Sequence, residues 1–296
     1  MVAHSKDTTA PGVEASIDGG TATETGRRRR PTFGDESTIA TARRVVFSLS
    51  LAAAAVLTIL FLPELLAQLA TGWTADVGAE LGIHRLHVMG IAAVVATFLL
   101  GLFAQAVRPQ SRVASMWGAF SLILVVSAGT VAYGVGRPEE VLPFLALTTI
   151  ALVTHPAGRG LFRRGRATSL ALLALLGVAA VPLLAFAATQ LPLSTNPADS
   201  HAVEGHYVML AGLALAPLAY GIPAALGMRG ARLAAWLAAL PIAYYGLLSL
   251  SFPAQVGSTG VLWGVAAVGW AVAFVAVAEY STGERTGRSR LSAARS

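Results

Sequence analysis

The sequence contains, at residues 86–107, the run LHVMGIAAVVATFLLGLFAQAV, which carries no charge over its whole length. A helix rises 1.5 Å per residue, so a run of about 20 apolar residues crosses the ~30 Å hydrocarbon core of a bilayer. The apolar residues are continuous rather than alternating, which favours a helix over a strand of a membrane barrel. The run therefore predicts a transmembrane helix.

Runs of the same kind recur along the chain. The other seven cover residues 45–66, 113–135, 141–157, 168–189, 206–228, 233–251 and 261–280. None of them has a charged residue at its centre. The predicted fold class is therefore all-α, a polytopic membrane protein with eight transmembrane helices.

The composition agrees with a lipid solvent. Of 296 residues, 55% are hydrophobic and 12% are charged, whereas a soluble domain carries about 25% charged residues. Mean hydropathy is +0.66. Cysteine is absent, which excludes disulfides, thiolate metal sites and cysteine nucleophiles. The net charge of +6 resides in tails and links instead of along one face, so we interpret it as a topology signal and expect no nucleic-acid partner.

The arginines beside and between the runs predict the orientation. Nearly all of them lie on one side of the predicted bundle, and the exceptions are Arg85 and Arg137. The positive-inside rule places the arginine-rich side, with both termini, in the cytoplasm. Residues 1–42 and 282–296 are polar and are expected to be disordered cytoplasmic tails. The preference for Arg over Lys, with abundant Ala, Gly and Val, indicates a GC-rich prokaryote and hence its cell membrane.

An internal duplication is expected from two similar stretches. Residues 108–117 (RPQSRVASMW) follow the second run, and residues 229–236 (RGARLAAW) follow the sixth. They divide the membrane part into four-helix halves at 43–166 and 167–281. Because each half has an even number of helices, the repeats would be parallel.

Histidines at the outer edge are the main candidates for a site, because polar side chains are costly in a membrane. His84 and His87 lie one helical turn apart at the outer start of the second run. His201 and His206 flank the outer start of the sixth run, at the equivalent place in the other half. The acidic residues that accompany these pairs are Glu80, Asp199 and Glu204.

Neutral imidazole ligates haem iron, copper or zinc, and a nearby carboxylate can orient the ring through its second nitrogen. Two helices from two halves could place an imidazole on each side of a haem. The alternative is that these histidines simply populate the membrane interface, as Trp and Tyr do. His155, at the inner end of the fourth run, is interpreted as an interfacial helix terminus, where imidazole favours the negative end of the dipole.

The stretch Glu80-x-x-x-His84-Arg85, which opens the second helix of an eight-helix protein, resembles haem A synthase. That family has haem-ligating histidines on helices 2, 4, 6 and 8. The resemblance implies that Glu80 and His84 match the helix 2 motif and that His206 matches the helix 6 ligand. The eighth run here has no His, and His155 lies at the opposite end of the fourth. The resemblance therefore implies at most one haem site, between the second and sixth runs.

The sequence thus favours a protein that binds haem or a transition metal, in haem handling or electron transfer. The expected ligands are His84, His87, His201 and His206. One alternative is a non-catalytic membrane subunit of a larger complex. Another is a small-solute transporter, although no helix centre carries the charge that ion coupling would use. No residue is assigned as catalytic, and the sequence leaves open whether the chain is an enzyme.

Overall fold

The computed structural model describes residues 33–73, 79–163, 165, 168–255 and 257–293. The chain divides into two units, residues 1–38 and residues 39–296. Of the first unit, only the beginning of helix α1 is described. The described residues are helical and contain no strand, which confirms the all-α class.

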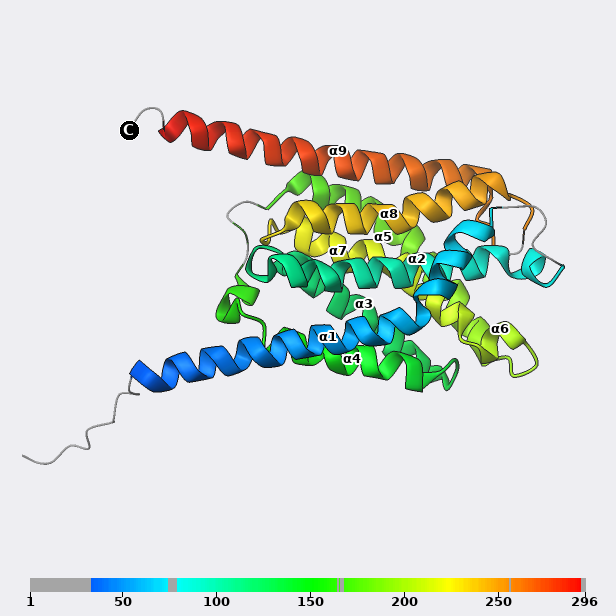
Figure 1. Ribbon diagram of the computed structural model, residues 1–296. Coiled ribbons are helices and arrows are strands. Elements are labelled where there is room, and N and C mark those ends of the chain that lie inside the picture. Colours follow the sequence, from blue (N-terminus) through cyan, green and yellow to red (C-terminus); the bar gives the residue numbers. More distant parts are fainter. Residues whose placement is uncertain (1–32, 74–78, 164, 166–167, 256, 294–296) are drawn as a thin grey trace, which may run out of the picture. The chain divides into compact units, whose positions relative to one another are not determined.

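The helices follow one another with short links (Figure 1). In chain order they are α1 (Phe33–Thr71), α2 (Ala79–Val107), α3 (Val113–Tyr133), α4 (Pro138–Val153), α5 (Leu170–Gln190), α6 (Ser200–Val203), α7 (His206–Ala225), α8 (Ala231–Ser251) and α9 (Gly260–Ala293). Three short 3₁₀ helices lie between them: η1 (Pro109–Ser111), η2 (Gly158–Phe162) and η3 (Leu191–Thr195).

Among the described residues, seven helices are long and apolar enough to cross a membrane. They are Ser37–Ala70, Arg85–Val107, Val113–Tyr133, Leu170–Thr195, His206–Ala225, Ala231–Ser251 and Gly260–Ser281. The fourth predicted run forms α4, which has only 16 residues and rises about 24 Å. Pro138 at its first turn and Pro156 just beyond its end limit its length, because proline favours a helix start and cannot continue a helix. The structure therefore supports a multi-pass membrane protein with seven such helices among the described residues, and it does not confirm the fourth predicted run as an eighth span.

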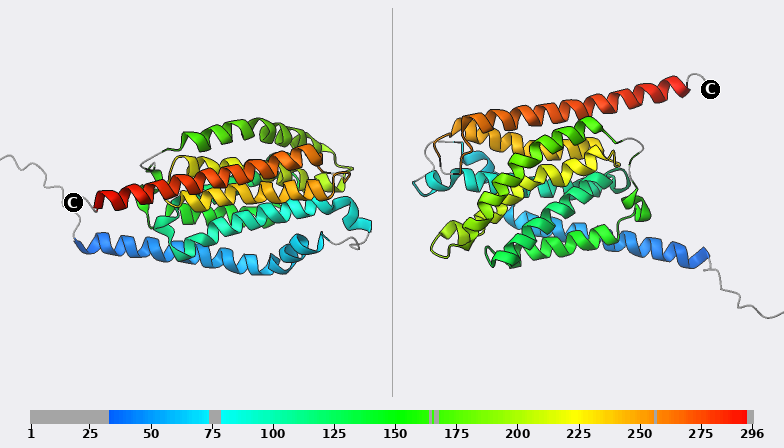
Figure 2. Two further views of the ribbon diagram at one scale, coloured as in Figure 1. Left: turned by 90° about the horizontal axis from the view of Figure 1, so that it is seen from above. Right: turned by 180° about the vertical axis from the view of Figure 1, so that it is seen from behind.

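Four helices form the centre of the second unit. Each of α2, α3, α7 and α8 packs against the other three, while α4 packs on α3, α5 on α7 and α9 on α8 (Figure 2). In these four helices, 61–72% of the most apolar stretch is buried, against 22–28% in α1, α5 and α9. The backbone of α1 makes only sparse contacts with its neighbours. The outer helices thus present most of their apolar surface outward, as a lipid solvent requires.

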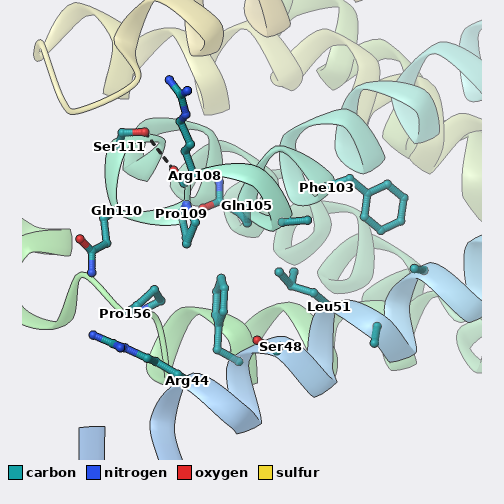
Figure 3. A pocket seen from close by; sticks show the side chains of 14 residues that line it. Arg44, Ser48, Leu51, Phe103, Gln105, Arg108, Pro109, Gln110, Ser111 and Pro156 are labelled. Atoms are coloured by element: carbon teal, nitrogen blue, oxygen red, sulfur yellow. Dashed lines mark hydrogen bonds between the residues drawn. The ribbon is translucent and has the colours of Figure 1, made fainter. Parts of the chain in front are cut away.

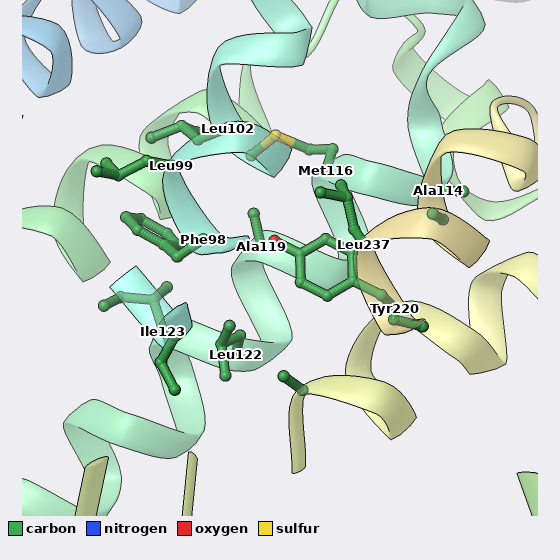
Figure 4. Packing of buried hydrophobic residues seen from close by; sticks show 14 of the residues in the cluster. Phe98, Leu99, Leu102, Ala114, Met116, Ala119, Leu122, Ile123, Tyr220 and Leu237 are labelled. Atoms are coloured by element: carbon green, nitrogen blue, oxygen red, sulfur yellow. The ribbon is translucent and has the colours of Figure 1, made fainter. Parts of the chain in front are cut away.

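The central helices meet in a core of interlocking large and small side chains (Figure 4). Tyr220 of α7 is fully buried, and its hydroxyl donates a hydrogen bond to the carbonyl oxygen of Thr97 at 3.1 Å. Its ring lies over Gly101 of α2 and Gly118 of α3, where any added side chain would overlap it. Small residues at such positions let membrane helices approach closely, so Gly101 and Gly118 make room for the buried ring of Tyr220.

The two links with similar sequences lie against each other. The amide of Ala114, just after the α2–α3 link, donates to the carbonyl of Arg229 at 2.9 Å. Gly230 adopts a φ of +82° and lies against the backbone of Arg112, so a Cβ there would clash. We refer to this end, with the 108–112, 158–165 and 226–232 links, as the arginine-rich end.

Both terminal helices extend into the ranges that the sequence interpretation assigned to disordered tails. α1 already begins at Phe33 and α9 continues to Ala293, so helix covers residues 33–42 and 282–293. Residues 1–32 and 294–296 lie outside the described residues.

Candidate metal centre

Three of the predicted histidines meet at the end of the bundle opposite the arginine-rich end. His87 lies near the start of α2, His201 lies in α6, and His206 is the first residue of α7. Their ring centres are 5.0 Å apart for His87 and His201, 6.2 Å for His87 and His206, and 5.6 Å for His201 and His206. One nitrogen from each ring lies within 4.8 Å of the other two. This arrangement is a group of three imidazoles that could hold a metal ion.

The short helix α6 brings His201 next to His206. Asp199 begins α6 by accepting a hydrogen bond from the amide of His201 at 3.0 Å, as N-cap residues do. Gly205 then adopts a φ of +76° and starts α7. A Cβ at Gly205 would lie 3.0 Å from the Cα of Gly136, and the amide of Gly136 donates to Val203 at 2.8 Å. The α3–α4 link therefore fixes the turn that positions both histidines.

Two carboxylates hold the rings from outside. Nδ1 of His201 lies 2.9 Å from Oδ1 of Asp199, and Nε2 of His206 lies 3.2 Å from Oε2 of Glu204. The hydroxyl of Tyr207 donates to the second oxygen of Asp199 at 2.7 Å. The hydrogen bonds from Tyr207 and His201 lower the pKa of the Asp199 carboxyl, so it is an anion at neutral pH. Carboxylates that orient ligating histidines in this way are characteristic of metal sites.

The centre is shielded from water on its inner side. His87 is only 2% exposed, whereas the side chains of His201 and His206 are 14% and 15% exposed. The α8–α9 link covers His87, because a Cβ at Gly257 would lie 3.0 Å from Nε2 of that ring. The hydroxyl of Tyr245 donates to the carbonyl of Gly257 and holds the link there. Residues of both predicted halves thus build one site.

The structure brings together three of the four predicted histidines and two of the three predicted acids. The side chains of the remaining two, His84 and Glu80, lie outside the described residues. The resemblance of this stretch to haem A synthase therefore stays a prediction. Sequence reasoning missed Tyr207 and the covering Gly257. Tyr207 could have been predicted, because it directly follows His206 in a stretch that also contains Asp199 and Glu204. Nothing in the sequence around Gly257 indicates that it contacts His87.

His155 belongs to a separate buried site at the arginine-rich end. As predicted, His155 follows the end of a helix, α4, but its side chain is fully buried within the bundle. Its Nε2 lies 3.1 Å from Oε1 of Gln105 on α2, and its Nδ1 accepts the amide of Ala157 at 3.1 Å. Gln105 in turn donates to Ser115 of α3 at 2.8 Å. This network, the His155 node, joins α2, α3 and the end of α4.

The His155 node contains a neutral imidazole. Burial, together with the positive charges of Arg229 and Arg43, lowers the pKa of His155 to about 4. Both ring nitrogens are already bonded inside the protein. The ring therefore acts as a structural link between helices.

Two cavities lie along the inner side of α1. One, of about 760 Å³, is at the arginine-rich end, and its lining changes from Arg44 and Gln110 on one side to Leu51 and Phe103 on the other (Figure 3). The other, of about 530 Å³, reaches the candidate metal centre and includes His206 and Glu204 in its lining. The second cavity therefore connects His206 with the interior of the bundle.

Comparison of the chain with protein-family models, with curated proteins and with solved structures found no match. The fold and the site define the class: a helical multi-pass membrane protein with a group of three histidines at one end of its bundle.

Proposed function

We propose that this protein is a membrane metalloprotein that binds one divalent transition-metal ion through His87, His201 and His206. The observation that carries the proposal is the convergence of one nitrogen from each ring to within 4.8 Å. A tetrahedral zinc site with bonds of about 2 Å needs nitrogens roughly 3.3 Å apart, so the rings need only small rotations. Asp199 and Glu204 hold Nδ1 of His201 and Nε2 of His206, so we expect Nε2 of His201 and Nδ1 of His206 to be the ligand atoms.

Zn²⁺ and Cu²⁺ suit this donor set best. Imidazole is a preferred ligand of both ions, whereas Mg²⁺ and Ca²⁺ prefer oxygen. Three histidines leave a fourth position for water or a substrate, as in catalytic zinc sites. The Asp199 and Glu204 carboxylates balance the charge of a bound dication. The group is therefore suited to chemistry at the metal as well as to holding it.

Haem, the cofactor that the sequence interpretation favoured, is the second candidate. His87 and His206 come from different halves and their ring centres are 6.2 Å apart, which resembles a pair of axial ligands. The ring of His201 lies beside the midpoint between them, 5.0 Å and 5.6 Å from each, where the macrocycle would have to lie. We therefore favour a single ion, with haem requiring the displacement of His201 and its α6 helix.

Metal analysis of the purified protein tests the proposal. Protein purified in mild detergent, stripped with a chelator and reloaded with Zn²⁺ or Cu²⁺, is expected to retain one ion per chain after desalting. His87→Ala, His201→Ala and His206→Ala are each expected to abolish retention. An absorption spectrum of the untreated protein separates an ion from haem, because only haem gives a Soret band.

The exposed Glu139→Gln variant is a matched control, because it removes a charge at the same end without touching the histidines. Size-exclusion profiles show whether each variant remains folded. Wild-type protein that folds and retains no metal after reloading would refute the proposal. A Soret band in the wild-type protein that disappears in His206→Ala would show that the site binds haem instead of a single ion.

We also propose that α4 spans as an eighth helix and that both termini are cytoplasmic, in the cell membrane of a prokaryote. The clustering of arginines at one end and the packing of α4 along α3 support this topology. The similar links at residues 108–117 and 229–236 support parallel four-helix repeats.

The natural absence of cysteine makes the topology directly testable by labelling single cysteines with a membrane-impermeant maleimide. Arg137→Cys is expected to react from outside the cell, and Arg159→Cys only after the membrane is opened. Reaction of both positions from the same side would exclude α4 as a span.

A further inference from the structure

The cavity beside the candidate metal centre has a polar mouth and an apolar interior. On α2 it extends from Val88 to Leu99, which corresponds to a depth of about 16 Å along the helix. Its interior is lined mainly by aliphatic and aromatic side chains, namely Ile91, Val95, Phe98, Leu122, Ile123 and Phe144. At about 530 Å³ it falls within the range of ligand cavities, about 300–1,000 Å³.

The mouth of the cavity is dominated by carboxylates. Glu64 accepts a hydrogen bond from Gln68 at 3.0 Å, and Glu140 pairs with Arg137 at 3.0 Å. Glu204, whose side chain is 59% exposed, pairs with His206. Carboxylates therefore outnumber arginines at the mouth, and they offer acceptor oxygens to a ligand.

Helix α1 forms one wall of this cavity. That helix packs sparsely on its neighbours, and it supplies Phe61 and Leu65 to the cavity wall. In the second half, by contrast, α5 packs closely on α7. The loose packing of α1 would admit a molecule from the bilayer to the space beside this helix.

We propose that this cavity binds a bilayer amphiphile with a hydrocarbon tail and a head group that donates hydrogen bonds or carries a positive charge. The tail fills the apolar interior, and the head group meets the carboxylates at the mouth, next to His206. In the metal-free protein, charge complementarity selects such a head over a phosphate or sulfate. This proposal names the substrate class of the metal centre and so rests on the proposed function. Occupancy of the cavity can nevertheless be measured without metal.

Photolabelling tests the proposal. The protein in nanodiscs is exposed to two probes with the same diazirine-bearing alkyl chain, one with a primary amine head and one with a phosphate head. Cross-links are mapped by mass spectrometry. The amine probe is expected to label cavity residues about fivefold more than the phosphate probe, the ratio that a half-exposed ion pair supplies. Equal labelling by both probes, or stronger labelling by the phosphate, would overturn the proposal.

Matched variants locate the label. Val95→Phe fills the cavity from its wall, whereas Val131→Phe places the same ring on an outward position of α3 that is 59% exposed. Labelling by the amine probe is expected to fall to background in Val95→Phe and to persist in Val131→Phe. Ile91→Phe gives a second cavity-filling variant if Val95→Phe lowers the yield. Persistence of the label in folded cavity-filling variants would refute the proposal.

Metal content measured on the same samples separates the two proposals. Protein that retains metal but is not labelled would contradict the amphiphile proposal alone. Protein that is labelled in the cavity but retains no metal would contradict the proposed metal site alone.

Discussion

The two histidine sites at opposite ends of the bundle differ in what surrounds the rings. At the His155 node, both nitrogens of one neutral imidazole are bonded by Gln105 and by the Ala157 amide. At the candidate metal centre, carboxylates orient two of three imidazoles whose nitrogens converge. A buried histidine whose nitrogens are bonded within the protein serves the fold. Several histidines directed at one point with carboxylates behind them are suited to binding a cation.

The largest expected effect is the loss of zinc binding when a proposed ligand is removed. His87→Ala is expected to weaken Zn²⁺ binding by more than about 100-fold, because even carboxylates behind the ligands contribute 10–100-fold. Competition with a zinc-sensitive dye measures the effect. His155→Ala serves as the contrast and is expected to bind zinc normally wherever it remains folded, so equal losses in both variants would remove the distinction between the sites.

For stability we expect the opposite order, with His155→Ala losing more than His87→Ala. His155→Ala removes a fully buried ring and leaves Gln105 without one partner, which should cost about 2–4 kcal/mol. Thermal unfolding in detergent, compared with metal-free wild type, measures the change. His87→Ala is the reference variant, and a smaller loss at His155 than at His87 in metal-free protein would contradict the structural role of the node.

A smaller effect on zinc affinity is expected when a carboxylate behind the ligands is removed. Asp199→Asn keeps the shape of the side chain but weakens its hold on His201, and zinc affinity is expected to fall about 10-fold to 100-fold. The same dye competition applies, with Glu139→Gln as the control for loss of one negative charge. Unchanged affinity in Asp199→Asn would mean that Asp199 only begins α6.

The smallest expected effect is on the pH dependence of stability. The pKa of His155 is lowered to about 4 in the folded protein, against about 6.5 in an unfolded chain. Between these values the unfolded chain takes up a proton that the folded protein does not, so stability should fall as the pH drops from about 6.5 to about 4. Unfolding of metal-free wild type and His155→Gln across this range should show a shallower decline in the variant. Parallel curves would exclude a contribution from His155.

Much of the fold could be predicted, because lipid demands long apolar helices wherever the chain crosses it. Each predicted run forms a helix, yet the two prolines that limit α4 were not weighed against its length. His87, His201 and His206 lie at one end of the bundle as predicted, since helix alternation determines which ends meet. Their convergence could not be derived, because it depends on the turn at Gly205 and on α6, four residues long. The burial of His155 was missed because Gln105, its partner, lies 50 residues away in sequence.

The distribution of the three histidines along the chain has a consequence for biogenesis. His87 lies in the second helix, whereas His201 and His206 are synthesised only after three further helices, α3, α4 and α5. A metal bound by all three rings can therefore be captured only after α7 has been inserted beside α2. Loading of the centre would then report that the chain has completed its assembly, and a truncated or misinserted chain would remain without metal.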